Sequence, residues 1–389
     1  MSGAGDSLLA LFAFLLGAVV GSFANVCIHR LPRGESVISP ASHCPSCGKA
    51  IAFHDNVPIV GWLFVRGRCR SCGARVSARY PLVELAVALL FLGAFLRWGL
   101  APATVAAALL SAASVILIAT DLEARILPDE VTLGTLALGL ALDAAADAAG
   151  RHRLSWGESD LLEALAGAAL GASVLLAVRF AYQALRGVEG MGLGDVKMIA
   201  MIGALTGPAG VLLSLFFGSV SGALLGGVLL LVRTARWSRA RRLARAGRLE
   251  RAAVVGGGLV LDEGGRVVAA GPRWSEIPGG SSPGAPPALA LPVGRPMLAL
   301  LRLGRRRARA GKTTFTGRLV LEDEESFFRV LAARVERMGE GRTLLLLSRA
   351  DIPFGVFLAL GALAAFAFGR PALALLFGDI PVPAARLLP

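Results

Sequence analysis

The strongest constraint on the fold is the way the apolar residues are grouped along the chain. They collect into runs of 18 to 25 residues, and a helix of about 20 apolar residues crosses the roughly 30 Å hydrocarbon layer of a membrane. Transmembrane β-strands are shorter and alternate apolar with polar residues, so these continuous runs favour helices. Only 17% of the residues are charged, which argues against an ordinary soluble domain. The sequence therefore predicts an all-α polytopic membrane protein.

About eight transmembrane helices are expected. The first run has no Lys or Arg before it and is longer than the apolar core of a signal peptide, so we expect a permanent span. The sixth is short and interrupted by glycine. The expected spans are 7–28, 81–100, 102–120, 131–149, 160–184, 196–209, 211–232 and 352–369.

The charge distribution predicts the orientation. The loop 29–80 holds eight Lys and Arg against two acidic residues, and 233–350 holds 23 against 10. Basic loops mark the cytoplasmic side of membrane proteins, although basic segments also bind anionic lipid or nucleic acid. We expect five domains. These are a first transmembrane helix (1–28), a cytoplasmic four-cysteine loop (29–80), a transmembrane peptidase core (81–232), a basic cytoplasmic insertion (233–350), and a last transmembrane helix with a C-terminal tail (351–389).

The basic insertion changes character along its length. We expect residues 233–251 to continue the seventh helix, 253–271 to form a hairpin, 278–297 to be a flexible linker and 315–347 to form a strand-and-helix unit. Arginines 302–309 suit anionic lipid headgroups, and no nucleic-acid partner is expected because interleaved aromatic residues are lacking. The Gly311-Lys312-Thr313-Thr314 run is not a P-loop, because six residues separate Gly304 from Gly311, where a P-loop has four.

Two aspartates at the ends of apolar runs are the candidate catalytic residues. Asp121 ends the third span and Asp195 begins the sixth, inside the glycine-rich segment Gly190–Asp195. Carboxylates near the hydrocarbon boundary are costly and are usually functional. If the two met across the bundle, they would share a proton, as peptide hydrolysis by water requires. From spacing alone, an ordinary helix cap remains the alternative, and Asp129 after Pro128 suits such a cap. Asp143 and Asp147 are expected only to face water.

Four of the five cysteines form two C-x-x-C pairs in the loop 29–80. The pairs are Cys44 with Cys47 and Cys69 with Cys72, separated by 21 residues, and a glycine follows each pair. This spacing is close to that of four-cysteine zinc sites. A closed structural Zn²⁺ site is expected, with a redox-active or unmetallated set as the alternative.

Several motifs in a fixed order resemble the prepilin peptidases, also called type IV leader peptidases. The family pattern is D…LPD followed by GxGD, matched here by Asp121 with Leu127-Pro128-Asp129 and by Gly192–Asp195. Pro353-Phe354-Gly355 opens the last span as in the family. The other motifs are Gly21–Val26, His29–Pro32, Cys44–Gly48, Asp55–Pro58, Gly67–Cys72 and Arg79–Glu84.

The resemblance implies an inner-membrane aspartic endopeptidase. Its substrates would be type IV prepilins or type II secretion pseudopilins, cut after a glycine at the end of a short basic leader on the cytoplasmic side. Asp121 and Asp195 would be catalytic, with Asp129, Gly192, Gly194 and Lys197 in support. The family also implies N-methylation of the new N-terminus with S-adenosylmethionine. The long insertion 233–350 departs from the family pattern.

A second reading belongs to another class of protein. A non-catalytic membrane scaffold or transporter could use the zinc loop and the basic insertion to recruit partners, with membrane lipids around it. Such a protein would tolerate Asp→Asn at both candidate positions, whereas an aspartate dyad would not. Transporters usually contain paired broken helices in related halves, and the sequence offers one glycine-broken span.

Overall fold

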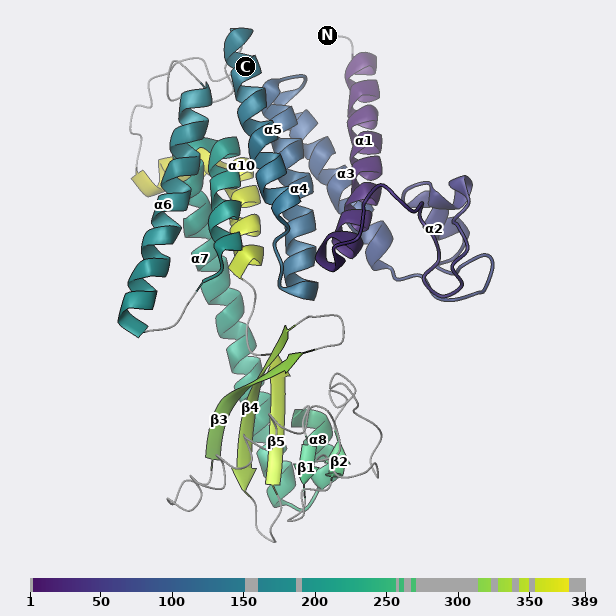
Figure 1. The fold of residues 1–389 in the computed structure, drawn as a ribbon, viewed down its shortest axis with the longest axis vertical. Coiled ribbons are helices and arrows are strands. Elements are labelled where there is room, and N and C mark those ends of the chain that lie inside the picture. The colour runs from purple at the N-terminus through teal and green to yellow at the C-terminus, as the bar shows by residue number, and fades with distance from the viewer. Residues whose placement is uncertain are drawn as a thin grey trace. The chain divides into compact units, whose positions relative to one another are not determined.

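The computed structural model describes residues 3–150, 160–186, 191–256, 259–261, 267–270, 314–322, 328–337, 343–349 and 354–377. The chain forms two compact units. The first comprises residues 1–222 and 353–389, and the second comprises residues 223–352 (Figure 1).

The first unit is a bundle of long helices around α4. Helix α4 packs against α1, α3, α5 and α10. Pro102 opens α4, where a missing N–H costs nothing, and Arg125 ends it in the left-handed conformation with φ of 59°. The long helices are α1 (Gly3–Arg30), α3 (Arg79–Trp98), α4 (Pro102–Ala124), α5 (Asp129–Ala148), α6 (Asp160–Arg186), α7 (Leu193–Arg245) and α10 (Phe354–Phe377).

The expected spans match these helices once α7 is considered closely. Among the described residues, six helices are long and apolar enough to cross a membrane. Helix α7 holds both the expected sixth and seventh spans, divided at Gly207, whose φ of 69° and ψ of −177° are non-helical, and Pro208 follows. The expected eighth span corresponds to α10. The helical membrane fold is confirmed, and its sixth and seventh spans are continuous in sequence with no loop between them.

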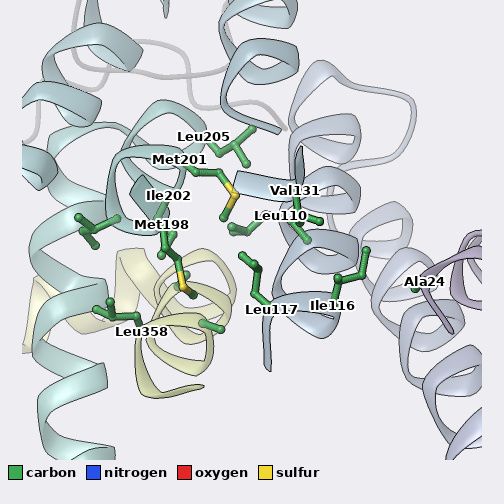
Figure 2. Packing of buried hydrophobic residues seen from close by; sticks show 14 of the residues in the cluster. Ala24, Leu110, Ile116, Leu117, Val131, Met198, Met201, Ile202, Leu205 and Leu358 are labelled. Atoms are coloured by element: carbon green, nitrogen blue, oxygen red, sulfur yellow. The ribbon is translucent and has the colours of Figure 1, made fainter. Parts of the chain in front are cut away.

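The core of the bundle joins α4, α7 and α10. Leu110 and Leu117 of α4 face Met198 and Ile202 of the first part of α7, and Leu358 of α10 lies beside them (Figure 2). All five side chains are at most 1% exposed. This core holds the interior of α4, the start of α7 and the start of α10 together.

Helices α6 and α7 approach each other through glycines. A Cβ built on Gly167 would lie 2.3 Å from the carbonyl oxygen of Gly203, and one built on Gly171 would lie 2.9 Å from that of Ile199. Because lipid tails are as apolar as the helices, association in a membrane relies on such small-residue contacts. They fix the first part of α7, which carries Asp195.

The acidic residues of α5 are not simply hydrated. Asp143 is fully buried, and the expectation that it only faces water is wrong. Asp147 accepts hydrogen bonds from the backbone N–H groups of Asp160, at 2.8 Å, and Leu161, at 3.2 Å. Asp147 therefore caps the first turn of α6.

The second unit contains the end of α7, helix α8 (Leu249–Gly256) and a five-stranded antiparallel sheet. Trp237, Ala240 and Ala244 of α7 form a small core with Ala252 and Val260. The strand order is β2-β1-β5-β4-β3. The strands are β1 (Leu259–Leu261), β2 (Val267–Ala270), β3 (Thr314–Glu322), β4 (Phe328–Arg337) and β5 (Thr343–Arg349).

This unit partly corrects the expectations for the insertion. The predicted continuation of the seventh helix is confirmed as far as Arg245. The hairpin is confirmed for β1 and β2, which pair antiparallel, but residues 253–256 belong to α8 rather than to a strand. The described residues within 315–347 form strands, and none of them is helical. The linker 278–297, arginines 302–309 and residues 311–313 lie outside the described residues.

Candidate active site

Asp121 lies in the last turn of α4, in a buried position. Only 7% of this residue is exposed. Its backbone carbonyl accepts a hydrogen bond of 3.2 Å from the N–H of Arg125. The left-handed turn at Arg125 ends α4 and directs the chain into Leu127-Pro128-Asp129. Asp121 is therefore held at the end of a rigid helix.

The start of α10 covers the Asp121 carboxylate. A Cβ built on Gly355 would lie 2.6 Å from Asp121 Oδ2, so only glycine leaves room for the carboxylate here. The backbone N–H groups of Gly355 and Val356 interact with the same carboxylate. Oδ2 itself is buried and has no hydrogen-bond partner among the described residues. A buried oxygen without a partner is a candidate reacting atom.

Asp195 approaches the same place from α7. It lies in the first turn of that helix, and its charge acts on Asp121 through space. The structure therefore places the two aspartates that the sequence singles out within electrostatic range of each other, although they lie on different helices. Two carboxylates in electrostatic contact are suited to general acid and base roles.

Leu127 connects the segments that surround this pair. A Cβ built on Gly194 would lie 3.2 Å from the Cβ of Leu127, and one built on Gly355 would lie 3.3 Å from its Cδ1. One leucine thus packs against both the GxGD segment and the start of α10. Gly192 has open space around it, its nearest neighbour to a built Cβ being the Gly194 nitrogen at 3.9 Å.

The supporting residues Asp129 and Lys197 form an ion pair. The Lys197 ammonium lies 2.7 Å from each carboxylate oxygen of Asp129. Asp129 is the first residue of α5, and Pro128 before it makes no side-chain cap. The sequence suggested an ordinary helix cap for Asp129. In the structure its carboxylate instead links the start of α5 to the first turn of α7.

Sequence reasoning missed two residues that support the site. Gly355 was noted only as part of a motif, and its contact with Asp121 joins segments distant in sequence. Arg179 of α6 donates a hydrogen bond to the carbonyl of Met191, which anchors the glycine-rich segment. A lone arginine in an apolar helix is a usable signal, because such a residue needs a partner.

The four cysteines of the loop converge on one point. Their sulfur atoms all lie within 4.8 Å of one another, and Cys44 Sγ is 3.9 Å from Cys72 Sγ. A tetrahedral zinc site with Zn–S bonds of about 2.3 Å separates its sulfurs by roughly 3.8 Å. His43 is not in this group, and its Nδ1 lies 3.1 Å from the carbonyl of Ala41. The thiols could bind a metal ion.

The two cysteine turns share one backbone pattern. The N–H of Gly48 bonds to the carbonyl of Cys44 at 2.9 Å, and the N–H of Gly73 bonds to that of Cys69 at 2.8 Å. Both glycines have positive φ, 68° and 72°, which favours glycine. Backbone N–H groups of Ser46 and Cys47 lower the pKa of the Cys44 thiol to about 6. Thiolates are the metal-binding form.

Polar contacts fasten this loop internally and to the bundle. Arg70, between the second pair of cysteines, donates two hydrogen bonds to Asp55, of 2.9 and 2.6 Å. Glu84 of α3 accepts a hydrogen bond of 2.6 Å from the backbone N–H of Ile59. Asn25 of α1 donates to the carbonyl of Tyr80 at 3.0 Å. The cysteine loop is therefore continuous with α1 and α3 through hydrogen bonds.

Comparison with known proteins places these features in a family. Residues 15–98 match the bacterial peptidase A24 N-terminal domain, and residues 108–227 match the type IV leader peptidase family. Neither match extends past residue 227. No solved structure matches the chain.

Curated relatives named prepilin leader peptidase/N-methyltransferase align with the same part of the chain. The relative from Myxococcus xanthus is 38% identical over 229 residues, which are 59% of this chain and 65% of the relative. The one from Aeromonas hydrophila is 36% identical over 250 residues, 58% of this chain and 83% of the relative. The one from Klebsiella pneumoniae is 39% identical over 202 residues, which are 50% of this chain and 84% of the relative.

The resemblance carried by the motifs is thus confirmed, and the two aspartates and the four cysteines lie within the matched residues. The chain belongs to the type IV leader peptidase family.

Proposed function

We propose that this protein is a prepilin leader peptidase in which Asp121 and Asp195 are the catalytic pair. The observation that carries the proposal is the electrostatic interaction of the two side chains: the charge of Asp195, in the first turn of α7, acts on the buried Asp121 carboxylate, which Gly355 of α10 covers. The buried Oδ2 of Asp121 lacks a hydrogen-bond partner among the described residues, as expected of an atom that awaits water or substrate.

The chemistry needs one ionised and one protonated carboxyl group. The ionised carboxylate takes a proton from water, and the water oxygen attacks the scissile carbonyl carbon. The protonated carboxyl gives its proton to the carbonyl oxygen. The tetrahedral intermediate then collapses: one of its hydroxyl groups returns a proton to the second carboxylate, the C–N bond breaks, and the leaving amine receives the proton that water lost. Both carboxyl groups thereby return to their starting protonation states.

The proposed substrates are type IV prepilins or type II secretion pseudopilins. A basic leader followed by an apolar stretch would place its scissile bond at the end of a membrane helix, where Asp121 and Asp195 lie. Carboxylates there attract a cationic leader. We propose that this face is cytoplasmic, in a bacterial inner membrane, because eight spans put the basic loop 29–80 and the basic segment 233–350 on the same side of the membrane as Asp121 and Asp195.

Asp129, Lys197, Gly192 and Gly194 are proposed to position the pair. The ion pair of Asp129 with Lys197 fixes the first turn of α7 relative to α5. Gly194 lets that turn pack against Leu127, and Gly192 leaves open space before it. None of these four is needed as a proton carrier.

The four thiols are proposed to hold a structural Zn²⁺ ion. Cys44, Cys47, Cys69 and Cys72 would supply four ligands, and such a closed set stabilises a fold and leaves no position for substrate. The ion would fix the two cysteine turns against each other. Arg70 then fixes Asp55, and the loop is held against α3 through Glu84.

Methylation of the new N-terminus is proposed from the names of the relatives alone. The described residues contain no glycine-rich turn between a strand and a helix that would identify a methyl-donor site. We therefore assign no residue to S-adenosylmethionine and derive no step through it.

The test is intact-mass analysis of a type IV prepilin co-expressed with this protein. Loss of the leader mass is expected with the wild type and with neither Asp121→Asn nor Asp195→Asn. Added mass of one methyl group on the product would support the second activity. Intact prepilin beside a well-folded wild-type protein would contradict the peptidase proposal.

The scaffold or transporter alternative makes the opposite prediction. A scaffold should retain its function when both aspartates become asparagine, because neither needs to carry a proton. No described observation favours it over the peptidase.

A further inference from the structure

The second unit contains a basic cavity that neither the proposed reaction nor the family matches involve. Its volume is about 380 Å³, and it lies between the end of α7 and α8. Half of its lining is cationic and half is aliphatic. The lining residues are Arg239, Leu243, Arg248, Arg251, Val254 and Val255.

The walls of this cavity are fixed by the packing of α7 against α8. Trp237 is 6% exposed and packs with Ala240, Ala244 and Ala252. Arg236 donates a hydrogen bond of 3.3 Å to the carbonyl of Val255, which ties the two helices together beside the cavity. Arg239 and Arg251 are therefore presented by a braced helix pair, and Arg248 by the short turn that joins the two helices.

The three arginines make no ion pair with any described side chain. Arg239 and Arg251 are exposed, as is Arg248, which directly precedes α8. Three guanidinium groups around one cavity repel each other unless an anion lies between them. Guanidinium groups bind phosphate oxygens through paired hydrogen bonds.

The position of the cavity along α7 indicates where such an anion comes from. Leu224, Leu225 and residues 228–232 are exposed apolar residues of this helix, as expected of a surface in contact with lipid tails. Arg239 follows Val232 by seven residues, which is about 10 Å along a helix. This places the cavity near the headgroup layer, within reach of long arginine side chains.

We propose that Arg239, Arg248 and Arg251 form a binding site for the phosphate of an anionic phospholipid. The guanidinium groups take the phosphate, and Leu243, Val254 and Val255 face the apolar part of the same lipid. A soluble phosphate ester shares the phosphate but gains little from an aliphatic wall. The site belongs to the part of the chain beyond residue 227, where the family matches end.

Lipid retention measured by native mass spectrometry tests the proposal. The full-length protein is reconstituted in phosphatidylcholine vesicles containing a minor fraction of phosphatidylglycerol and is then released in mild detergent. Wild-type protein is expected to retain phosphatidylglycerol over phosphatidylcholine. Arg239→Gln and Arg251→Gln are each expected to weaken this retention about fivefold, the effect of about 1 kcal/mol per basic residue.

Arg242→Gln is the matched control, because it removes the same charge from the exposed surface of α7 outside the cavity. It is expected to leave retention unchanged. Equal loss of phosphatidylglycerol retention in Arg242→Gln and Arg239→Gln would overturn the proposal, since lipid retention would then depend on the net charge of the protein alone. An absence of preference for phosphatidylglycerol in the wild type would also overturn it.

A parallel titration with inorganic phosphate separates the two sources of phosphate. Saturable phosphate binding that needs Arg239, together with lipid retention that does not, would assign the cavity to a soluble ligand and refute the lipid site. The thermal unfolding temperature of each variant shows whether its fold is intact. Prepilin cleavage is measured separately, so failure of this site and failure of the peptidase proposal are distinguishable.

Discussion

The α-carbon of Gly355 lies so close to Asp121 that a Cβ at this position would sit 2.6 Å from the carboxylate Oδ2. Two segments that are far apart in the sequence therefore share one small space. Either α10 or the carboxylate must move if residue 355 carries a side chain. The first turn of α10 acts as a wall of the proposed catalytic site.

Gly355→Ala is expected to lower the rate of prepilin cleavage by about a hundredfold, because displacement of a reacting group by about 1 Å costs that much. The rate is measured on purified protein with prepilin substrate. Gly93→Ala on α3 is the control, since a Cβ there would meet nothing within 4 Å. Full activity in Gly355→Ala would show that α10 can retreat freely from Asp121.

The ion pair between Asp129 and Lys197 predicts a mild effect of removing either charge. The side chains are 55% and 35% exposed, and pairs this exposed contribute about 0.2–1 kcal/mol. Asp129→Asn is expected to slow cleavage by no more than about fivefold, whereas Asp121→Asn abolishes it.

A double-mutant cycle checks the same pair. Adding Lys197→Met to Asp129→Asn should produce little further loss, because the interaction is already broken. If Asp129→Asn proved as inactive as Asp121→Asn, Asp129 would take part in the chemistry itself.

Metal content is expected to depend on the four converging cysteines. Purified protein should carry one zinc ion per chain, measured by elemental mass spectrometry, and Cys69→Ser should lose it. Cys27→Ala is the matched control, because Cys27 is buried in α1, outside the group of four thiols. A protein that carries no zinc but forms disulfides between the pairs would contradict the metal assignment.

Much of this arrangement follows from local sequence. Apolar runs located the helices, because each must satisfy its backbone hydrogen bonds internally within lipid. The two C-x-x-C-G runs located the cysteine turns, because each turn depends on a few adjacent residues. The glycine-rich segment and the aspartate at the end of the third span indicated the candidate site, because a carboxylate near the hydrocarbon boundary is energetically costly.

Other features depend on contacts between segments that are distant in sequence, and local sequence patterns could not predict them. The burial of Asp143 and the pairing of Asp129 with Lys197 are set by which helices become neighbours. The contact of Gly355 with Asp121 is of the same kind. In 315–347, the periodicity of short apolar runs did not distinguish strand from helix, and the pairing of β3 with β4, β4 with β5 and β5 with β1 decides the outcome.

Acid pH is expected to act on the cysteine loop through Asp55. The hydrogen bonds from Arg70 hold the pKa of Asp55 below its usual value of 3.8. The stabilisation of the folded loop by the Asp55–Arg70 pair is therefore fully present above about pH 4 and is lost as pH falls through the lowered pKa of Asp55. Asp55→Asn should lower the thermal unfolding temperature relative to wild type equally at pH 7 and pH 5, and the difference should shrink below about pH 4.

Glu35→Gln serves as the control for that comparison, because Glu35 is an exposed acid of the same loop. Its unfolding temperature should stay near that of the wild type at every pH. A difference for Asp55→Asn that grows toward acid pH would contradict the proposed role of the ion pair.

Gly207 separates the two parts of α7, and its conformation predicts a specific cost of substitution. Its φ of 69° and ψ of −177° lie in a region that only glycine occupies readily, so a side chain there costs about 1–3 kcal/mol. Gly207→Ala should lower the thermal unfolding temperature and weaken cleavage, because the first part of α7 carries Asp195. Gly134→Ala on α5, where a Cβ meets nothing within 4 Å, should change neither. If Gly207→Ala unfolds like the wild type, the break at this position would have to be maintained by Pro208 alone.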